Sequence, residues 1–563
     1  MRESSSGILV LAVAVGAATG IAAVAFRYLI TGATRLFTGY DDYSGLGRIA
    51  SAQWPALGFW FLLAVPVVAG AIYGPVIYRF APEARGHGVP EVMYAVSERG
   101  GRIAPKVVVL KAFASALCIG GGGSVGREGP IVQIGSATGS TLAQLIRLDT
   151  PRVRLLVACG AAGGIAATFN APLAGPFFAM ELILRNFAAE SFGAVVLSSV
   201  TASVVGRAIL GNTAFLTLPV FAVRNPVEYP LYLLLGLVVG AVGVCFSKVL
   251  YLIEDLCDRA WRGPEWARPA VGGLLLGGLL IALPQMYGVG YPVLENAVEG
   301  KYMLGMLALL LIGKMLATSL TSGIGGSGGV FAPTLFIGAM AGTAFGEIVH
   351  QILPAATESP GAYGLVGMAA ALGGSTRAPI TAVIILFELT GEYSIILPLM
   401  VAVAVATGVS RLLSSDTIYT RKLLRRGIDI DRPHHPFAAV TAADLAQPIP
   451  ESLWESSDLA SAAKMLEKTP GGMLPAIDDR GRYRGCVSAR DVAESLDAPE
   501  PPAAVAALIR TLPPITADTG FHDVVTALAG HGGTGLPVLD ADRTAVIGWV
   551  NYEALLAVLH PDH

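Results

Sequence analysis

The sequence predicts an all-α polytopic membrane protein that is followed by a smaller α/β domain. The 563 residues are 53% hydrophobic and only 14% charged, whereas an average soluble protein carries about 25% charged residues. Apolar segments follow one another from about residue 7 to residue 414. The residues after 414 have ordinary charge and short alternating segments, which are typical of a soluble α/β domain.

The apolar segments differ in length and in how often glycine and proline interrupt them. A membrane-spanning helix needs about 20 apolar residues, and we interpret residues 7–26 as a retained first membrane helix, not a signal peptide. Other segments long enough to span are 228–246, 303–320 and 392–413. Interrupted segments are 104–119, 131–146 and 160–180. Because unpaired backbone cannot face lipid, we expect these broken helices to be buried or to line a cavity.

The apolar region contains an internal repeat. Three stretches match three others in the same order and at nearly one spacing: 111–139 with 314–342, 86–90 with 288–292, and 171–182 with 378–389. The sequence therefore predicts a membrane domain at 1–414 made of two halves, about 1–210 and 225–414. Breaks in corresponding positions of two halves are typical of transport sites.

The end of the chain predicts a linker and a second duplication. Four basic residues follow the last apolar run and indicate the cytoplasmic side of a membrane: Arg421, Lys422, Arg425 and Arg426. We expect a linker at 415–437 and a soluble region at 438–563, divided into copies at 438–497 and 505–560. Residues 474–492 resemble 536–555, and each copy predicts a strand, a turn, a strand and a helix.

Charge and cysteine content exclude some functions. The net charge of −3 gives no sign of a nucleic-acid partner. The five cysteines are scattered and form no C-x-x-C pair, so we expect neither a disulfide framework nor a metal site.

Residues 120–130 read GGGGSVGREGP, and three interpretations compete for them. A dinucleotide loop would fit the pattern G-x-G-x-x-G, but that motif needs a preceding strand, and here an apolar helix is expected. Close packing of membrane helices through small residues explains the glycines but leaves Glu128 unexplained. The third interpretation is an anion site made of backbone amides at the start of a helix.

The third interpretation has a physical basis. A helix start carries about half a positive charge and several unpaired N–H groups, and Pro130 suits a first helical turn. Two copies from the repeat would direct two helix starts at one point. The Glu128 carboxylate can occupy the same amides and block the path, whereas the second copy has Phe331 at this position.

These motifs together resemble the CLC chloride channel and transporter family followed by a pair of CBS domains. The resemblance covers nearly the whole chain and rests on GREGP (126–130), GVFAP (329–333), G-x-G-x-P (86–90), FNAPLAG (169–175) and TIYTRKL (417–423). It implies an inverted repeat of broken helices, a homodimer with one pore per subunit, and a multi-pass protein of the plasma (inner) membrane. The N-terminus and the CBS domains would be cytoplasmic.

The resemblance also implies roles for individual residues. Glu128 matches the gating glutamate, the amides of Val330 and Phe331 match the central anion site, and the Tyr419 hydroxyl would close the inner side of that site. Gly126, Arg127 and Gly129 surround the same site. Chloride is the expected bound ion, and no cofactor or metal is required.

Two positions depart from the family pattern. His87 stands where serine is usual, and we expect direct or near contact with the anion, the alternative being a ring that turns away. Leu182 stands at the inner proton position of the exchangers. Glu181 precedes it but aligns with Glu388 of the other half, so we expect a structural role for both, such as capping or interface packing.

The replacement of the inner proton glutamate by Leu182 favours a passive, voltage- or pH-gated anion channel. The alternative is a proton-coupled chloride exchanger. A membrane enzyme is disfavoured because His87 is the only histidine between Met1 and His350, with no HExxH motif. The remaining alternative, a membrane-tethered nucleotide-sensing module, is disfavoured by the duplicated pore motifs.

The predicted CBS pair offers one half-site for an adenine nucleotide. The ribose-binding pattern is present in the first copy as Gly485, Ser488 and Asp491, whereas Asn551 and Ala554 replace the equivalent residues of the second copy. Two functions therefore remain as alternatives for this region: binding of an adenine nucleotide, or a purely structural role as a dimerising module.

Overall fold

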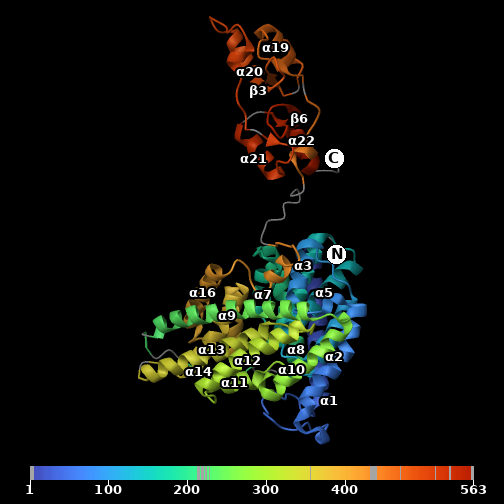
Figure 1. Ribbon diagram of the computed structural model, residues 1–563, viewed down its shortest axis with the longest axis vertical. Helices are drawn as coiled ribbons and strands as arrows, with labels where there is room; N and C mark the ends of the chain where they lie inside the picture. Colours follow the sequence, from blue (N-terminus) through green and yellow to red (C-terminus); the bar gives the residue numbers. More distant parts are fainter. Residues whose placement is uncertain are drawn as a thin grey trace. The chain divides into compact units, whose positions relative to one another are not determined.

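The chain forms two compact units, Met1–Ile430 and Asp431–His563. The computed structural model describes residues 5–559 apart from 212–215, 217–220, 222–224, 227, 356, 431–439, 450, 470, 514 and 532–533 (Figure 1). Residues 415–430 pack with the first unit, although the sequence places them in the linker. Linker residues 431–437, together with 438, 439 and 560, lie outside the described residues.

The first unit is a helical repeat. The helices of its first half are α1 (Ser5–Thr38), α2 (Phe61–Phe80), α3 (Val89–Glu98), α4 (Lys106–Gly120), α5 (Glu128–Leu145), α6 (Thr150–Phe169), α7 (Ala174–Phe178), a π-helical turn (η3, Ala179–Leu184) and α8 (Ala189–Leu210). Their counterparts are α9 (Glu228–Ala260), α10 (Arg268–Ala282), α11 (Tyr291–Val298), α12 (Leu304–Gly323), α13 (Phe331–Ile352), α14 (Pro360–Thr376), α15 (Pro379–Thr390) and α16 (Ile396–Leu413). A short helix, α17 (Thr420–Leu424), follows.

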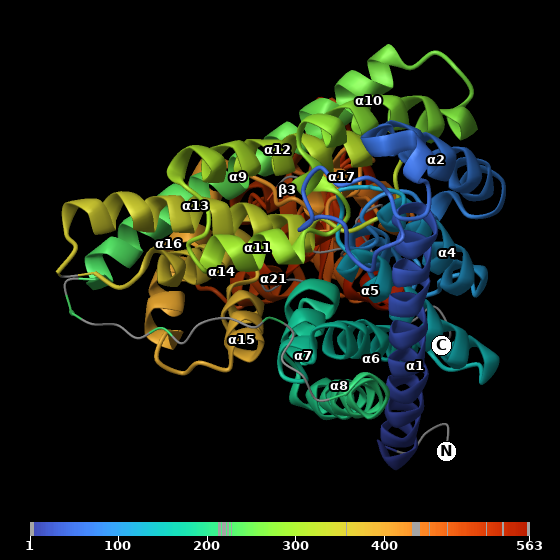
Figure 2. The same cartoon turned by 90° about the horizontal axis from the view of Figure 1, so that it is seen from below.

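Equivalent helices of the two halves pack in equivalent ways. In the first half α5 packs on α6 and α1 on α8, and in the second half α13 packs on α14 and α9 on α16. Figure 2 shows α6, α7 and α8 side by side, with α1 crossing the ends of α6 and α8. The backbone repeats too, because Gly122 and Gly325 both have φ of 92°, a conformation that glycine adopts without strain.

Eight helices in the described part of the chain are long and apolar enough to cross a membrane. They include the helices expected from residues 7–26, 228–246, 303–320 and 392–413. The interrupted segments form α4, α5 and the run α6–α7, and the ends of α4 and α5 that meet around residues 120–128 are buried in the protein. Burial at these ends is expected from the cost of exposing unpaired backbone to lipid.

The second unit contains two similar three-stranded sheets. The first has the order β1-β2-β3 (Leu453–Trp454, Met473–Ile477, Tyr483–Ser488), and the second has the order β4-β5-β6 (Ile515–Thr516, Gly535–Leu539, Val546–Asn551). In each sheet the first pair of strands is parallel and the second antiparallel. The helices are α18 (Ala442–Leu445), α19 (Leu459–Glu467), α20 (Ala489–Leu496), α21 (Phe521–His531) and α22 (Tyr552–Leu559). The predicted strand, turn, strand and helix of each copy are therefore present.

Each copy contributes a segment to the core of the other. Ala442 and Leu445 of α18 are buried in the cluster formed by the second copy. Val505, the first residue of the predicted second copy, is buried with the first copy. The predicted limits 438–497 and 505–560 therefore divide the sequence into two copies, but each hydrophobic core contains residues from both sides of that division.

Candidate functional site

Three glycine-rich loops meet at the centre of the first unit. Gly126 and Gly329, which are equivalent in the repeat, form an antiparallel bridge with N···O distances of 2.7 and 2.6 Å. Gly86 pairs with the same second-half loop through the N–H of Gly328 and the carbonyl of Gly326. An antiparallel bridge between equivalent residues places the pseudo-twofold axis of the repeat between them.

The loops approach each other so closely that side chains would not fit. A Cβ on Gly129 would lie 2.0 Å from the His87 carbonyl oxygen and 2.9 Å from the Gly329 Cα. Glycine is required here because backbone packs against backbone. The loop at 120–130 follows a helix, α4, and not a strand, which rules out the dinucleotide-binding geometry.

A helix begins at each of the two paired loops. α5 starts at Glu128 after the N-cap Arg127, and α13 starts at Phe331 after the N-cap Val330. Neither N-cap side chain forms a capping hydrogen bond. The first-turn amides of two helices therefore converge near the Gly126–Gly329 bridge, which creates a positive local potential and a set of N–H donors.

The Glu128 carboxylate lies in this convergence. Its side chain is buried, and Oε1 accepts a hydrogen bond from the Tyr291 hydroxyl. A Cβ on Gly126 would lie 2.1 Å from Glu128 Oε2 and 3.2 Å from the Ala332 nitrogen, so Oε2 sits over Gly126 and beside the first turn of α13. No protein donor among the described residues hydrogen-bonds Oε2. The carboxylate thus occupies the amide-lined space that an anion would fill.

Phe331 and Tyr419 are buried next to the same region. The Phe331 ring packs against Phe169 and Phe178, with centroids 5.6 and 6.4 Å away. Tyr419 is the N-cap of α17, is 1% exposed and interacts electrostatically with Glu128. The second-half counterpart of Glu128 therefore packs against aromatic rings.

The His87 ring is buried on the side of α9. Nε2 lies 3.6 Å from Oε1 of Glu254, and the ring meets Tyr251 edge-on at a centroid distance of 6.4 Å. Neither ring nitrogen has a hydrogen-bond partner among the described residues. The backbone of His87, by contrast, contacts Gly129 directly. The ring therefore faces Glu254 and Tyr251, and the part of His87 that lies at the paired loops is its backbone carbonyl.

Two buried lysines hold the loops in place, and sequence reasoning did not assign them a role. Lys111 Nζ donates to the carbonyls of Ala84 and Gly86, at 2.8 and 2.9 Å. Its repeat counterpart Lys314 donates to the Gly288 and Val289 carbonyls, at 3.1 and 2.9 Å, and to Ser124 Oγ. The sequence repeat could have predicted this shared role, because Lys111 and Lys314 are the first residues of the two aligned stretches 111–139 and 314–342.

Leu182 lies in the π-helical turn after α7 and is buried. The preceding Glu181 accepts hydrogen bonds from the backbone N–H groups of Ile380 and Thr381 at the start of α15. Its carboxylate is therefore engaged with a helix start, which confirms the expected capping role.

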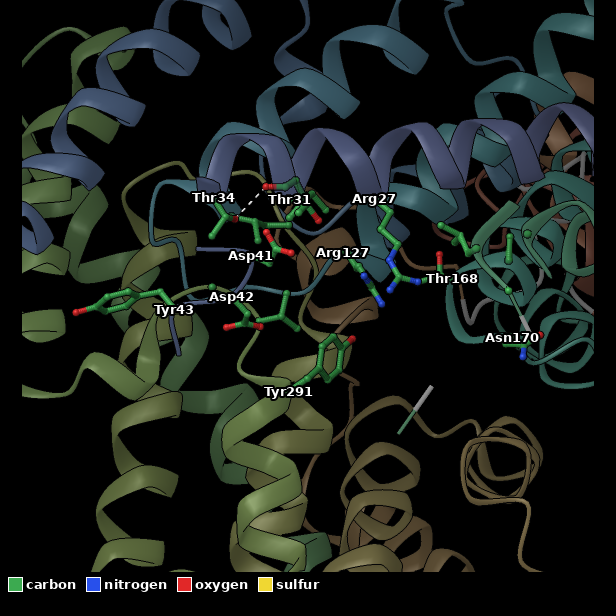
Figure 3. Close-up of a pocket in the computed structure, with 18 of the residues that line it drawn as sticks. Arg27, Thr31, Thr34, Asp41, Asp42, Tyr43, Arg127, Thr168, Asn170 and Tyr291 are labelled. Carbon is green, nitrogen blue, oxygen red and sulfur yellow. Dashed lines mark hydrogen bonds between the residues drawn. The ribbon is translucent and has the colours of Figure 1, made fainter. Parts of the chain in front are cut away.

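A cavity of about 350 Å³ lies beside Arg127 and Tyr291 (Figure 3). The guanidinium groups of Arg27 and Arg127 point into the same space, between Thr168 and Tyr291. Arg207 also lines the cavity. Arg27 and Arg207 were not singled out from the sequence, because they come from α1 and α8, outside the recognised motifs.

The predicted nucleotide half-site borders a cavity of about 680 Å³ in the second unit. Ser488 is the N-cap of α20, and its Oγ donates to Asp491 Oδ2 at 2.7 Å. Oδ1 of Asp491 forms an ion pair with the exposed Arg510. In the second copy the Asn551 side chain caps α22 by accepting from the Ala554 N–H at 2.8 Å. Both motifs therefore stabilise helix starts, whatever else they bind.

These features define a multi-pass integral membrane protein in which an inverted repeat places two amide-rich helix starts around one buried carboxylate. A family model described as "Voltage gated chloride channel" matches residues 67–411. The chain is 33% identical over 432 residues to "Putative chloride channel protein ClcB-like" of Ralstonia nicotianae, which covers 75% of this chain and 98% of that protein. The chain belongs to the voltage gated chloride channel family.

Other relatives and solved structures agree with this membership. The chain is 36% identical over 380 residues to "H(+)/Cl(-) exchange transporter ClcA" of Vibrio campbellii, covering 66% of this chain and 81% of that protein. The structure of a slow cyanobacterial Cl−/H+ antiporter matches with a TM-score of 0.65 and 26% identity, over 76% of this chain and 99% of that one. A eukaryotic CLC transporter matches over 97% of both chains with a TM-score of 0.63 and 23% identity, a likeness of fold that includes the second unit.

Proposed function

We propose that this protein carries chloride or a related small anion across a membrane, with Glu128 as the gate. The observation that carries the proposal is the position of the Glu128 carboxylate among the convergent first-turn amides of α5 and α13. Oε2 lies beside Gly126 and the Ala332 nitrogen in the first turn of α13, in space that an anion bound at this helix start would need. The names of the relatives, which include a chloride channel protein and chloride exchangers, support the choice of ion.

The gate follows from the chemistry of a carboxylate. As an anion, Glu128 is attracted by its charge to the same helix starts that would attract chloride, so it competes with the permeating ion. Protonation removes the charge and most of the attraction to the helix starts. We expect Gly126, Arg127 and Gly129 to shape this site and Tyr419 to close its other side. The absence of a full fixed charge in an amide site allows an anion to leave as well as enter.

The orientation and assembly are also proposals. The basic residues around α17 favour the cytoplasmic side for Tyr419, His87 and the second unit. The cavity at Arg27 and Arg127 would then face outward and attract anions by its positive charge. We propose a homodimer in the plasma (inner) membrane, with no enzymatic activity and no required cofactor.

Passive, gated conduction is the transport mode that we favour. Leucine cannot carry a proton at position 182, and the neighbouring Glu181 is engaged with the α15 helix start. Proton-coupled exchange is the second candidate, favoured by the names of the Vibrio relative and the cyanobacterial structure. Reversal potentials across a proton gradient separate the two, because only an exchanger shifts with the gradient.

We further propose that the second unit is a CBS pair that binds an adenine nucleotide in the cavity at Ser488 and Asp491. The cavity volume of about 680 Å³ is within the range of small-molecule sites. For the nucleotide to bind, Asp491 would break its ion pair with Arg510 and accept hydrogen bonds from the ribose hydroxyls instead.

Anion flux from reconstituted vesicles at two outer pH values tests the main proposal. The wild-type protein should conduct more at low outer pH, and Glu128→Gln should conduct at both pH values. Wild-type flux with unchanged pH dependence in Glu128→Gln would refute the assignment of the gate.

A further inference from the structure

Tyr291 is the residue from the second half that contacts the proposed gate. Its hydroxyl donates to Oε1 of Glu128, although the two residues are 163 positions apart. Tyr291 is the first residue of α11, and the loop before it is fixed by Lys314, which binds the Gly288 and Val289 carbonyls. The hydroxyl therefore comes from an anchored backbone.

The repeat shows that this tyrosine has no equivalent in the other half. Tyr291 aligns with Val89, just as Glu128 aligns with Phe331. One side of the site thus combines an acid with a phenol, and the pseudo-symmetric side combines two apolar residues. The two polar departures from symmetry contact each other, which indicates that they act together.

The surroundings of Tyr291 restrict its ring to this position. The Arg127 guanidinium lies 5.4 Å from the ring centroid, on the side of the cavity shown in Figure 3. A cation over an aromatic face is attractive. Arg127 thereby fixes the ring between the cavity and Glu128.

We propose that Tyr291 is a latch that holds the Glu128 carboxylate in its blocking position. The inference rests on the proposed gating role of Glu128. A hydrogen bond to a carboxylate is stronger than one to a neutral acid, so the latch stabilises the closed, ionised state selectively. Tyr291 is a positioning residue, because it acts on the anion path through Glu128.

The other charged or titratable groups around Glu128 come from three elements. Arg127 precedes it in α5, Lys314 lies on α12, and Tyr419 caps α17. Tyr291→Phe leaves these groups in place and removes a single hydroxyl. Because the hydroxyl also interacts with Arg127, the double variant with Glu128→Gln is needed to assign the effect to the latch.

Flux from vesicles that contain wild-type protein, Tyr291→Phe, Glu128→Gln or the double variant tests the latch. Loss of a hydrogen bond to a charged group shifts an equilibrium by about tenfold, so Tyr291→Phe should raise flux several-fold at neutral pH. The outer pH for half-maximal flux should rise by about one unit, since less acid is then needed to release Glu128. Tyr287→Phe is the matched control, because its hydroxyl binds the Gly120 carbonyl and not Glu128.

The outcomes separate the latch from the gate. If Glu128→Gln opens the path while Tyr291→Phe leaves flux and pH profile unchanged, the latch is wrong and the gate stands. If Tyr291→Phe raises flux equally in the Glu128→Gln background, the tyrosine acts by another route and the latch is again wrong. If Glu128→Gln has no effect, the proposed function itself fails. Monodisperse elution in detergent checks that each variant folds.

Discussion

Glu181 and Glu388 cap the starts of each other's helices across the repeat axis. Glu181 belongs to the turn after α7 and binds the Thr381 N–H, at 2.8 Å, at the start of α15. Glu388 belongs to α15 and binds the N–H groups of Leu173 and Ala174, at 2.9 and 2.7 Å, at the start of α7. The two half-repeats are thus joined by a symmetric pair of carboxylates, each of which satisfies otherwise unpaired amides.

The reciprocal caps predict matched stability effects. Glu181→Ala and Glu388→Ala should each destabilise the membrane unit by about 1–3 kcal/mol, because each leaves amides unsatisfied. Thermal unfolding of the purified protein in detergent measures this effect. Anion flux at fixed pH should change little in Glu181→Gln. Loss of proton-dependent flux in Glu181→Gln but not in Glu388→Gln would instead make Glu181 part of a proton path.

His87 predicts a dependence of flux on inner pH. Protonation of the ring would add a positive charge beside the anion path and should raise flux at acidic inner pH. Since burial lowers the pKa of the ring, the rise should come below the ordinary histidine range. The groups that face the ring are Glu254 and Tyr251 on α9, together with Lys111 and Lys422. His87→Ser should flatten the inner pH profile in vesicles and leave the outer profile intact. An unchanged inner profile would show that His87 does not tune the path.

Nucleotide binding should stabilise the second unit of the full-length protein. A ligand at 100 times its Kd adds about 2.7 kcal/mol to stability, so ATP, ADP or AMP should raise the temperature at which this unit unfolds. Asp491→Asn should abolish the shift, whereas Arg484→Gln, exposed on β3 and outside the lining of this cavity, serves as a surface control. A shift that persists in Asp491→Asn would place the nucleotide elsewhere, and no shift at all would favour the structural module.

Cys486 borders the same cavity, yet it should be unreactive. Burial raises the pKa of its thiol to about 12. Since only the thiolate is nucleophilic, iodoacetamide should leave Cys486 unmodified in the folded protein at pH 8, with reaction increasing as the pH approaches 12. Mass spectrometry of the peptide gives the extent of labelling. Rapid labelling at pH 8 without unfolding would show that the thiol is ionised or exposed.

The repeat made the centre of the site predictable from the sequence. Matching the stretches at Gly126 and Gly329 predicts that equivalent helix starts converge, and Pro130 marks the first turn of one of them. Capping by Glu181 follows from its alignment with Glu388. In each case, the repeat predicts that two segments far apart in the sequence lie close together in the fold.

Contacts without a repeat signal could not be predicted. Tyr291 lies in a stretch that aligns with residues 86–90. An alignment of the two halves highlights the residues that they share, whereas Tyr291 matters because it differs from Val89 at the equivalent position. The exchange of segments between the two copies of the second unit was also missed. The apolar residues of a short segment such as Ala442–Leu445 predict that it will be buried. They do not predict whether it packs in the core of the first copy or of the second.

Diffraction from crystals of Glu128→Gln grown in bromide tests the central claim most directly. The anomalous signal of bromide locates the ion without reference to the protein model, and the neutral side chain no longer competes for the amides. We expect a peak within hydrogen-bonding distance of the Val330 and Phe331 amides, with Tyr419 on its other side. A bromide bound only outside the convergence of α5 and α13 would contradict the account.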